Sequence, residues 1–279
     1  LEELLGSEKK IKAVICKELD AVSSKYGQPR KTQLVYDHEL NVPDEPDMPD
    51  YPVTVFISRE GYFKKITPQS LRMSGEQKLK DGDEVLFTCE STNSVELLFF
   101  TNHRQVYKSH AYDFNDSKAS VLGDYVASAL GMEEGEVPLY MVVTPDYKGW
   151  MLFFYDNGKC AKVPLSSYET KQNRRKLLKA YCDKEPLATM FFLPEETELA
   201  IRTSASRMLL VGTAQIAAKT TRDSQGVAVV TLKKNQTIAS VVPADTLELA
   251  NPHRYRVRSL PATGALIRAE DEGEQMSLL

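Results

Sequence analysis

The sequence predicts an all-β fold in which four-stranded blades form a radial array behind one N-terminal helix. From residue 53 onward, short runs of β-branched and aromatic residues alternate with polar turns, which is typical of strands. One hairpin pattern also recurs at offsets of 43, 54 and about 47 residues. A single blade leaves apolar faces exposed, so repeated blades are expected to stack around an axis.

Residues 1–26 predict an amphipathic helix. Ile11, Ile15 and Leu19 recur at four-residue steps with Lys and Glu between them. Ser7 can cap the start of the helix, and Gly27 can end it. Because one helix cannot bury its own apolar stripe, it is expected to pack on an upstream segment, the following domain or a partner.

Residues 34–52 are predicted to be an extended linker. The segment from 35 to 52 has six acidic residues, four prolines and no Lys or Arg. Such a composition favours neither helix nor strand and keeps the chain solvated.

The repeated unit is a strand, a tight turn and a second strand. Its turn residues are Glu-Gly, His-Arg, Asn-Gly and Ala-Ser, and Asn157-Gly158 predicts a type I′ turn. The four copies are Phe56–Lys65, Phe99–Lys108, Phe153–Lys162 and, with one inserted residue, Ala200–Leu210.

A polar turn that leads into an apolar strand follows some of the hairpins. It occurs at Lys80–Val85, at Glu133–Val137 and, more weakly, at Lys233–Ile238. Each unit is therefore predicted to hold two hairpins. Helical composition outside the N-terminal segment is confined to residues 117–130 and 171–182.

Charge is distributed unevenly along the chain. Lys and Arg total 35 and Asp and Glu total 39, a net charge of −4. The net charge is −4 over residues 1–50, +2 over residues 51–243 and −2 over residues 244–279. The overall charge excludes a uniformly basic nucleic-acid binder, but the middle of the chain is slightly basic between two acidic ends.

Several classes of protein are excluded by missing patterns. No run approaches 18 apolar residues, so no membrane partner is expected. The first residues lack the features of a signal peptide and an initiating Met, so the chain is expected to be part of a longer one. Cys16, Cys89, Cys160 and Cys182 are scattered, which indicates a reducing, cytoplasmic location and no zinc site.

The chain also carries no recognisable catalytic motif. It has no P-loop and no GxGxxG, GxSxG or HExxH pattern, so we expect no catalytic residue, no metal and no cofactor. His103 and His110 are expected at the surface, and Glu133, Glu134 and Glu136 are expected in a turn before a strand.

The sequence resembles the C-terminal domain of the A subunit of bacterial type IIA topoisomerases, the DNA gyrase and topoisomerase IV family. Two independent sets of segments carry the resemblance, in the right order, between residues 1 and about 260. They are Leu4–Glu8, Ile15–Leu19 and Lys25–Thr32 near the start, and Val53–Val55 with Gly61–Lys65, Leu97–Asn102 with Val106–Lys108, and Ser224–Leu232 further on.

The resemblance implies a β-pinwheel whose basic outer rim binds or bends duplex DNA. It places the end of the breakage-reunion core at 1–33, the linker at 34–52, the pinwheel at 53–262 and an acidic tail at 263–279. Family members usually have five or six blades, whereas four units are clear here. The implied partners are double-stranded DNA, the upstream core and the ATPase subunit, in the bacterial cytoplasm with the nucleoid. The nucleophilic tyrosine would lie upstream of residue 1, so the segment itself would be non-catalytic.

One departure from the family pattern concerns the glycine- and arginine-rich box of gyrase subunits. At the corresponding place the chain has Leu71–Lys78, without such a box, and only Gln172–Lys176 resembles it. This favours a topoisomerase IV-like parent enzyme.

A rim that binds DNA does so through phosphates, which Lys and Arg neutralise. Phe56, Phe99, Trp150, Phe153 and Phe154 are expected in blade cores rather than stacked on bases. The predicted DNA-binding residues are Lys64, Lys65, Arg72, Lys78, Arg104, Lys108, Lys171, Arg174, Arg175, Lys176, Arg207, Lys219 and Arg222.

The sequence leaves alternatives open for the function of the domain and for the role of its acidic tail. The propeller can instead be a platform for protein partners, with its basic residues incidental, while an independent hydrolase is disfavoured. The acidic stretch Glu270–Glu274 can compete with DNA for the rim, or it can be a solubilising end.

Overall fold

The computed structural model describes residues 6–28, 48–73, 76–170 and 175–271, and the chain divides into two units at residue 47. In the first unit, helix α2 (Glu8–Tyr26) follows Ser7 and ends before Gly27, which confirms the predicted helix within the described residues. The apolar side chains Ile15, Leu19 and Val22 on this helix are about half exposed, at 49%, 62% and 53%.

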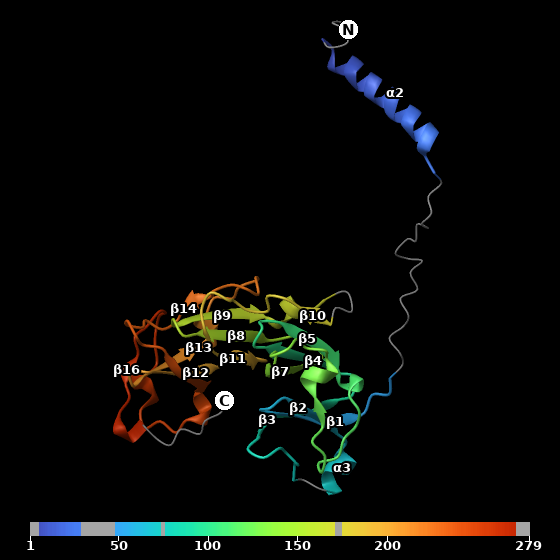
Figure 1. Cartoon of the computed structure of the whole chain (residues 1–279). Coiled ribbons are helices and arrows are strands. Elements are labelled where there is room, and N and C mark those ends of the chain that lie inside the picture. Colours follow the sequence, from blue (N-terminus) through green and yellow to red (C-terminus); the bar gives the residue numbers. More distant parts are fainter. Residues whose placement is uncertain (1–5, 29–47, 74–75, 171–174, 272–279) are drawn as a thin grey trace. The chain divides into compact units, whose positions relative to one another are not determined.

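The second unit contains four antiparallel sheets of four strands each, which confirms the predicted all-β, propeller-like class (Figure 1). Blade 1 contains β3 (Val85–Thr92), β1 (Pro52–Ser58), β2 (Tyr62–Ile66) and β6 (Asp124–Tyr125), and blade 2 contains β7 (Pro138–Thr144), β4 (Glu96–Thr101), β5 (Val106–His110) and β10 (Lys176–Leu177). Blade 3 contains β11 (Leu187–Leu193), β8 (Trp150–Tyr155), β9 (Lys159–Pro164) and β14 (Val227–Ala228), and blade 4 contains β15 (Ile238–Pro243), β12 (Glu198–Thr203), β13 (Arg207–Gly212) and β16 (Ala265–Leu266).

Each blade is built around one hairpin rather than two, which corrects the prediction of two hairpins per unit. The first hairpin strand pairs with a later strand on one side, as β1 pairs with β3. The second pairs on the other side with an outer strand of only two residues. In blades 1 to 3 this outer strand comes from beyond the next blade's hairpin, so successive blades are interlocked.

All four hairpins share one turn, and it is not the type I′ turn predicted at Asn157-Gly158. The N–H groups of Gly61, Arg104, Gly158 and Ser206 donate to the carbonyl three residues earlier, and these four residues have positive φ. A type I′ turn needs positive φ at both central residues, and Asn157 has none. The turns are three-residue loops that end in a left-handed residue. The shared turn also matches Ile201, not Ala200, with Phe153, so the fourth copy has no inserted residue.

Apolar side chains from facing blades form the core. Phe63 and Phe99 pack between blades 1 and 2, Phe100 and Phe153 between blades 2 and 3, and Phe154 with Leu199 between blades 3 and 4. The prediction that Phe99, Phe153 and Phe154 belong to blade cores is confirmed, since all three have no exposed surface.

The two terminal blades cover their remaining faces with their own chain segments. On blade 1, Phe56 and Ile66 pack under Ala119 and Leu71, the latter from helix α3 (Pro68–Met73). On blade 4, Met208 and Leu210 pack under Tyr255 and neighbouring residues of the segment 244–267. Within the described residues, no apolar cluster joins blade 4 to blade 1.

The two further helical predictions are wrong for the described residues. Residues 117–130 contain β6 and only the four-residue helix α4 (Val126–Ala129), and residues 175–182 contain β10. Pairing with the preceding blade outweighs the helical composition of both segments. The remaining helical turns are short 3₁₀ elements: η1 (Ala111–Asp113), η2 (Leu165–Tyr168), η3 (Thr213–Gln215), η4 (Ala244–Thr246), η5 (Pro252–Arg254) and η6 (Ala269–Asp271).

The pinwheel extends beyond residue 262, where the sequence placed its end. Strand β16 completes the sheet of blade 4. Asp271 is only 2% exposed, and its carboxylate accepts hydrogen bonds from the Tyr255 hydroxyl at 2.6 Å and the Ala250 N–H at 2.8 Å. Asp271 therefore anchors the last described turn on blade 4 and is not available to compete with DNA. The other acidic residues from 272 onward lie outside the described residues.

Candidate nucleic-acid interface

Several of the candidate DNA-binding cations lie on the segments that supply the outer strands. Each segment reaches the edge of its blade, turns, and pairs as a two-residue strand, as 217–228 does on blade 3. Arg175, Lys176 and Lys179 lie on the segment of blade 2, and Lys219 and Arg222 lie on that of blade 3. The segment of blade 1, residues 114–125, instead has Asp116 and Asp124 against one lysine. Positive charge therefore gathers on the edges of the later blades.

We call five of the candidate cations the basic rim: Arg104, in the turn of the blade 2 hairpin, and Arg175, Lys176, Lys219 and Arg222 on the outer segments. The Arg104 carbonyl accepts a hydrogen bond from Ala180 N–H at 2.9 Å, which holds the turn of the blade 2 hairpin beside the end of β10. Arg222 donates to the Ser167 carbonyl at 3.4 Å in η2, and η2 leads into the segment of blade 2. This contact ties the outer segment of blade 3 to η2, which directly follows strand β9 of the same blade.

The rim cations differ in whether a carboxylate already neutralises them. Arg104 and Arg175 are exposed and Lys219 and Arg222 are half-buried. None of these four forms an ion pair with another described residue. Lys176, in contrast, contacts Glu133 at 2.7 Å.

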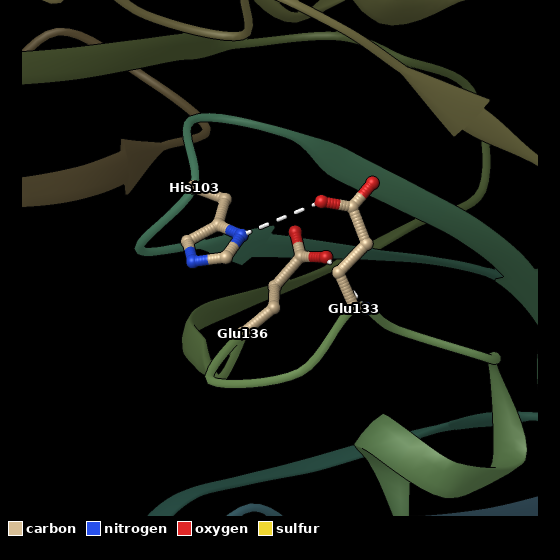
Figure 2. A group of neighbouring side chains, drawn as sticks. All are labelled: His103, Glu133 and Glu136. Carbon is tan, nitrogen blue, oxygen red and sulfur yellow. Dashed lines mark hydrogen bonds and ion pairs between the residues drawn. The ribbon is translucent and has the colours of Figure 1, made fainter.

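Lys176 belongs to a small network around the hairpin turn of blade 2, of which Figure 2 draws His103, Glu133 and Glu136. Its ammonium lies 5.3 Å from the centre of the Tyr107 ring. The Tyr107 hydroxyl donates to Glu136 at 2.8 Å, and Glu136 also accepts from the Thr101 hydroxyl and the Glu133 N–H. His103 Nδ1 lies 3.8 Å from the Glu133 carboxylate.

His103, Glu133 and Glu136 lie close enough together to resemble a metal-ligand set, but their hydrogen bonds give each carboxylate another role. Glu136 is buried, which by itself raises its pKa, yet the hydrogen bonds from Thr101, Tyr107 and Glu133 N–H hold that pKa below the ordinary value. Lys176 lowers the pKa of Glu133 in the same sense. Both acids lie in the turn that precedes β7, as the sequence predicts for them.

Three of the predicted DNA-binding lysines are buried and do not reach the surface of the rim. Lys64 is 3% exposed, Lys65 3% and Lys108 8%. Lys64 donates to the carbonyls of Lys78 at 2.7 Å and Ala119 at 3.2 Å, and its burial lowers its pKa. These contacts hold the loops over blade 1 in place.

Lys65 and Lys108 occupy one repeated position, which Lys162 occupies in blade 3. Lys65 contacts Asp116 at 3.2 Å and lies over the Tyr51 ring. Lys108 contacts Glu96 at 3.5 Å and lies over Tyr147, while Lys162 pairs with Glu196 and lies over Trp150. We call these three residues the seam lysines, because each contacts the connection that leads from its own blade to the next, at Asn93, Tyr147 and Glu196 respectively. Blade 4 has Leu210 at this position, under the apolar segment that covers its face.

The other predicted residues are spread over different elements. Arg72 is exposed on α3 and Lys78 is exposed in the loop after it. Arg207 is half-buried on β13, where its guanidinium donates to the Gly264 carbonyl at 2.7 Å. Lys171 and Arg174 lie outside the described residues. The sequence reasoning did not select Lys179, Arg254 and Arg258, which are exposed on outer segments. The alternation of arginine at 254, 256 and 258 is the signal that could have found two of them.

No described helix has the length and apolar composition that crossing a bilayer requires. A family model described as "DNA gyrase C-terminal domain, beta-propeller" matches residues 96–120, which cover the blade 2 hairpin, and 203–245, which cover β13 and β15.

Two curated relatives represent both branches of the family. The chain is 30% identical over 181 residues to the A subunit of DNA gyrase from Streptomyces coelicolor, covering 61% of this chain and 21% of that protein. It is 24% identical over 183 residues to the A subunit of DNA topoisomerase 4 from Bacillus subtilis, covering 64% and 23%. The chain thus spans about a fifth of the length of these relatives.

The fold itself is shared with a solved structure, the crystal structure of the C-terminal domain of DNA topoisomerase IV. The TM-score is 0.63 at 19% sequence identity, and the match covers 78% of this chain and 73% of that chain. Taken together with the interlocked blades, the family model and the two relatives, the chain belongs to the C-terminal β-pinwheel domain family of the A subunits of DNA gyrase and topoisomerase IV.

Proposed function

We propose that this domain binds double-stranded DNA through the basic rim and presents a DNA segment to the rest of a type IIA topoisomerase. The observation that carries the proposal is that four rim cations have no carboxylate partner among the described residues. Such cations neutralise phosphates and release counterions, which gives affinity with little reading of sequence. The upstream core and the ATPase subunit would be the partners of the domain in the whole enzyme.

The limited number of rim cations predicts moderate affinity with a measurable dependence on salt. The logarithm of the binding constant falls with the logarithm of salt by about 0.9 for each phosphate neutralised. A rim of four or five contacts therefore binds duplex DNA well only at low ionic strength.

Replacing Arg175, Lys219 and Arg222 by alanine is expected to weaken binding to a duplex by on the order of 10²-fold at about 0.1 M salt. The slope of the logarithm of the binding constant against the logarithm of salt should become shallower by about 3. The measurement is a fluorescence-anisotropy titration of the whole chain at several salt concentrations. The matched control replaces Lys184, Lys233 and Lys234, which are exposed and, like the three replaced rim residues, form no ion pair with another described residue. The control should bind like the parent chain.

Two outcomes would contradict the proposal. Equal losses in the rim variant and the control would mean that only net charge matters. Absence of binding at the lowest salt would instead favour a platform for protein partners.

We further propose that the parent enzyme is topoisomerase IV-like, because residues 71–78 lack the box of gyrase subunits. Nicked circular DNA that is sealed by ligase in the presence of the domain should then keep the linking number of free DNA. A shift that grows with protein concentration would indicate chiral wrapping and a gyrase-like parent.

A further inference from the structure

The pairing of Lys176 with Glu133 suggests a control on the rim that the charge pattern alone does not show. Lys176 lies in the densest basic run of the chain, and it is the one rim cation that contacts a carboxylate, at 2.7 Å, within the described residues. Its side chain is 34% exposed and that of Glu133 is 58% exposed. The pair is therefore open to solvent and to a phosphate that competes for the ammonium.

The backbone position that Lys176 occupies in blade 2 holds a glycine in each of the other three blades. Gly123, Gly226 and Gly264 precede the outer strands of blades 1, 3 and 4, and all three have positive φ. Lys176 fills the same position in blade 2 without positive φ. A long cationic side chain therefore stands at an edge where the other blades have none.

The neighbours of Glu133 fix the backbone of the turn from which its carboxylate reaches Lys176. Its own N–H donates to Glu136 at 3.1 Å, and Glu136 is held in turn by Thr101 and Tyr107. The other carboxylate oxygen of Glu133, Oε2, lies 3.8 Å from His103 Nδ1, and Figure 2 draws this ion pair. The turn is thus fixed so that Glu133 faces the cation.

We propose that Glu133 is an intramolecular competitor for DNA phosphate, which keeps Lys176 neutralised and lowers the affinity of the rim. This inference rests on the proposed DNA binding by the rim. When duplex DNA arrives, a phosphate must displace the carboxylate, so Lys176 contributes less to binding than an unpaired rim cation. Glu133 is a positioning residue, because it acts through Lys176.

The test compares Glu133→Gln with Glu134→Gln in the whole chain. Glu134 is exposed in the same turn, and it forms no ion pair with another described residue. Both variants lose one negative charge within one residue of each other. Only Glu133→Gln should release Lys176. The release should raise duplex affinity up to about eightfold at about 0.1 M salt, and it should steepen the slope of the logarithm of the binding constant against the logarithm of salt by about 1.

A second background separates the pair from a general charge effect. In a chain that carries Lys176→Ala, the Glu133→Gln change should give no more than the small gain seen with Glu134→Gln. Thermal midpoints of all these variants should agree closely, because exposed ion pairs contribute little to stability.

The outcomes distinguish this inference from the proposed function. If the parent chain binds DNA but Glu133→Gln and Glu134→Gln behave alike, the competitor role is wrong and the rim stands. If the gain from Glu133→Gln persists in the Lys176→Ala background, the role is also wrong. If neither the parent chain nor any variant binds, both proposals fail together.

Discussion

Replacing Glu196 by alanine is expected to destabilise the pinwheel by about 2–4 kcal/mol, whereas replacing its partner Lys162 by methionine should change stability by less than about 1 kcal/mol. The asymmetry follows from burial. Lys162 has 4% of its side chain exposed and Glu196 has 40%. Loss of the carboxylate leaves an ammonium buried beside the Thr213 carbonyl and the Trp150 ring. Loss of the lysine leaves a carboxylate that water can reach.

The fourth blade already shows that an apolar side chain fits this position, since Leu210 replaces the seam lysine there. Equilibrium urea unfolding of both single variants and the double variant gives the three free energies that are needed. A double variant that recovers most of the loss of Glu196→Ala would support this account. Equal losses in the two single variants would contradict it.

The pH dependence of Glu196→Ala has a definite sign. Burial by itself raises the pKa of Glu196, but hydrogen bonds from Lys162 and Thr213 outweigh it and hold the pKa below the ordinary value. The carboxylate therefore stabilises the native state above the ordinary pKa of glutamate, and this contribution is lost as the pH falls through the lowered pKa. The difference between the parent chain and the variant should thus shrink in acid.

A second large effect is expected at Gly226, which stands just before the outer strand of blade 3. A Cβ at this residue would lie 2.0 Å from the Cys160 carbonyl oxygen and 2.2 Å from its carbon, and φ is +75°. Gly226→Ala must therefore move β14 away from β9, at a cost of about 3 kcal/mol or more from overlap and backbone strain together.

The matched control for Gly226→Ala is Gly82→Ala. Gly82 has φ of +84°, but a Cβ there would meet no atom within 4 Å. This change should cost only the left-handed backbone term of about 1–2 kcal/mol. Thermal unfolding and hydrogen exchange at Val227 and Cys160 measure the difference. Comparable losses of stability in both variants would show that the positive φ alone, and not the overlap with Cys160, accounts for the cost of Gly226→Ala.

The Gly226 variant also bears on the interface, because residues 219–226 carry Lys219 and Arg222. Detachment of β14 should weaken DNA binding even where the rest of the domain stays folded. Gly82→Ala lies in blade 1 and should leave DNA binding unchanged in the folded state.

The sequence by itself determined the number of hairpins, their spacing and the strand character of the central strands. These features are local: Phe154 and Cys160 pair across one tight turn, and the continuous apolar run that is buried there lies within a few residues. The N-terminal helix was predictable for the same reason, because its apolar periodicity and the residues that begin and end it, Ser7 and Gly27, lie within one short stretch of sequence.

Only the tertiary structure decided which strands complete each blade and which lysines face solvent. The outer strands β6, β10, β14 and β16 have two residues each, too few for a sequence pattern, and they form because the preceding blade offers an unpaired edge. Lys65 and Arg175 are both basic residues, and the sequence carries no signal that separates the buried one from the exposed one. Lys65 is buried because Asn93 and Asp116, far along the chain, meet it at a blade seam, while Arg175 meets no such partner among the described residues.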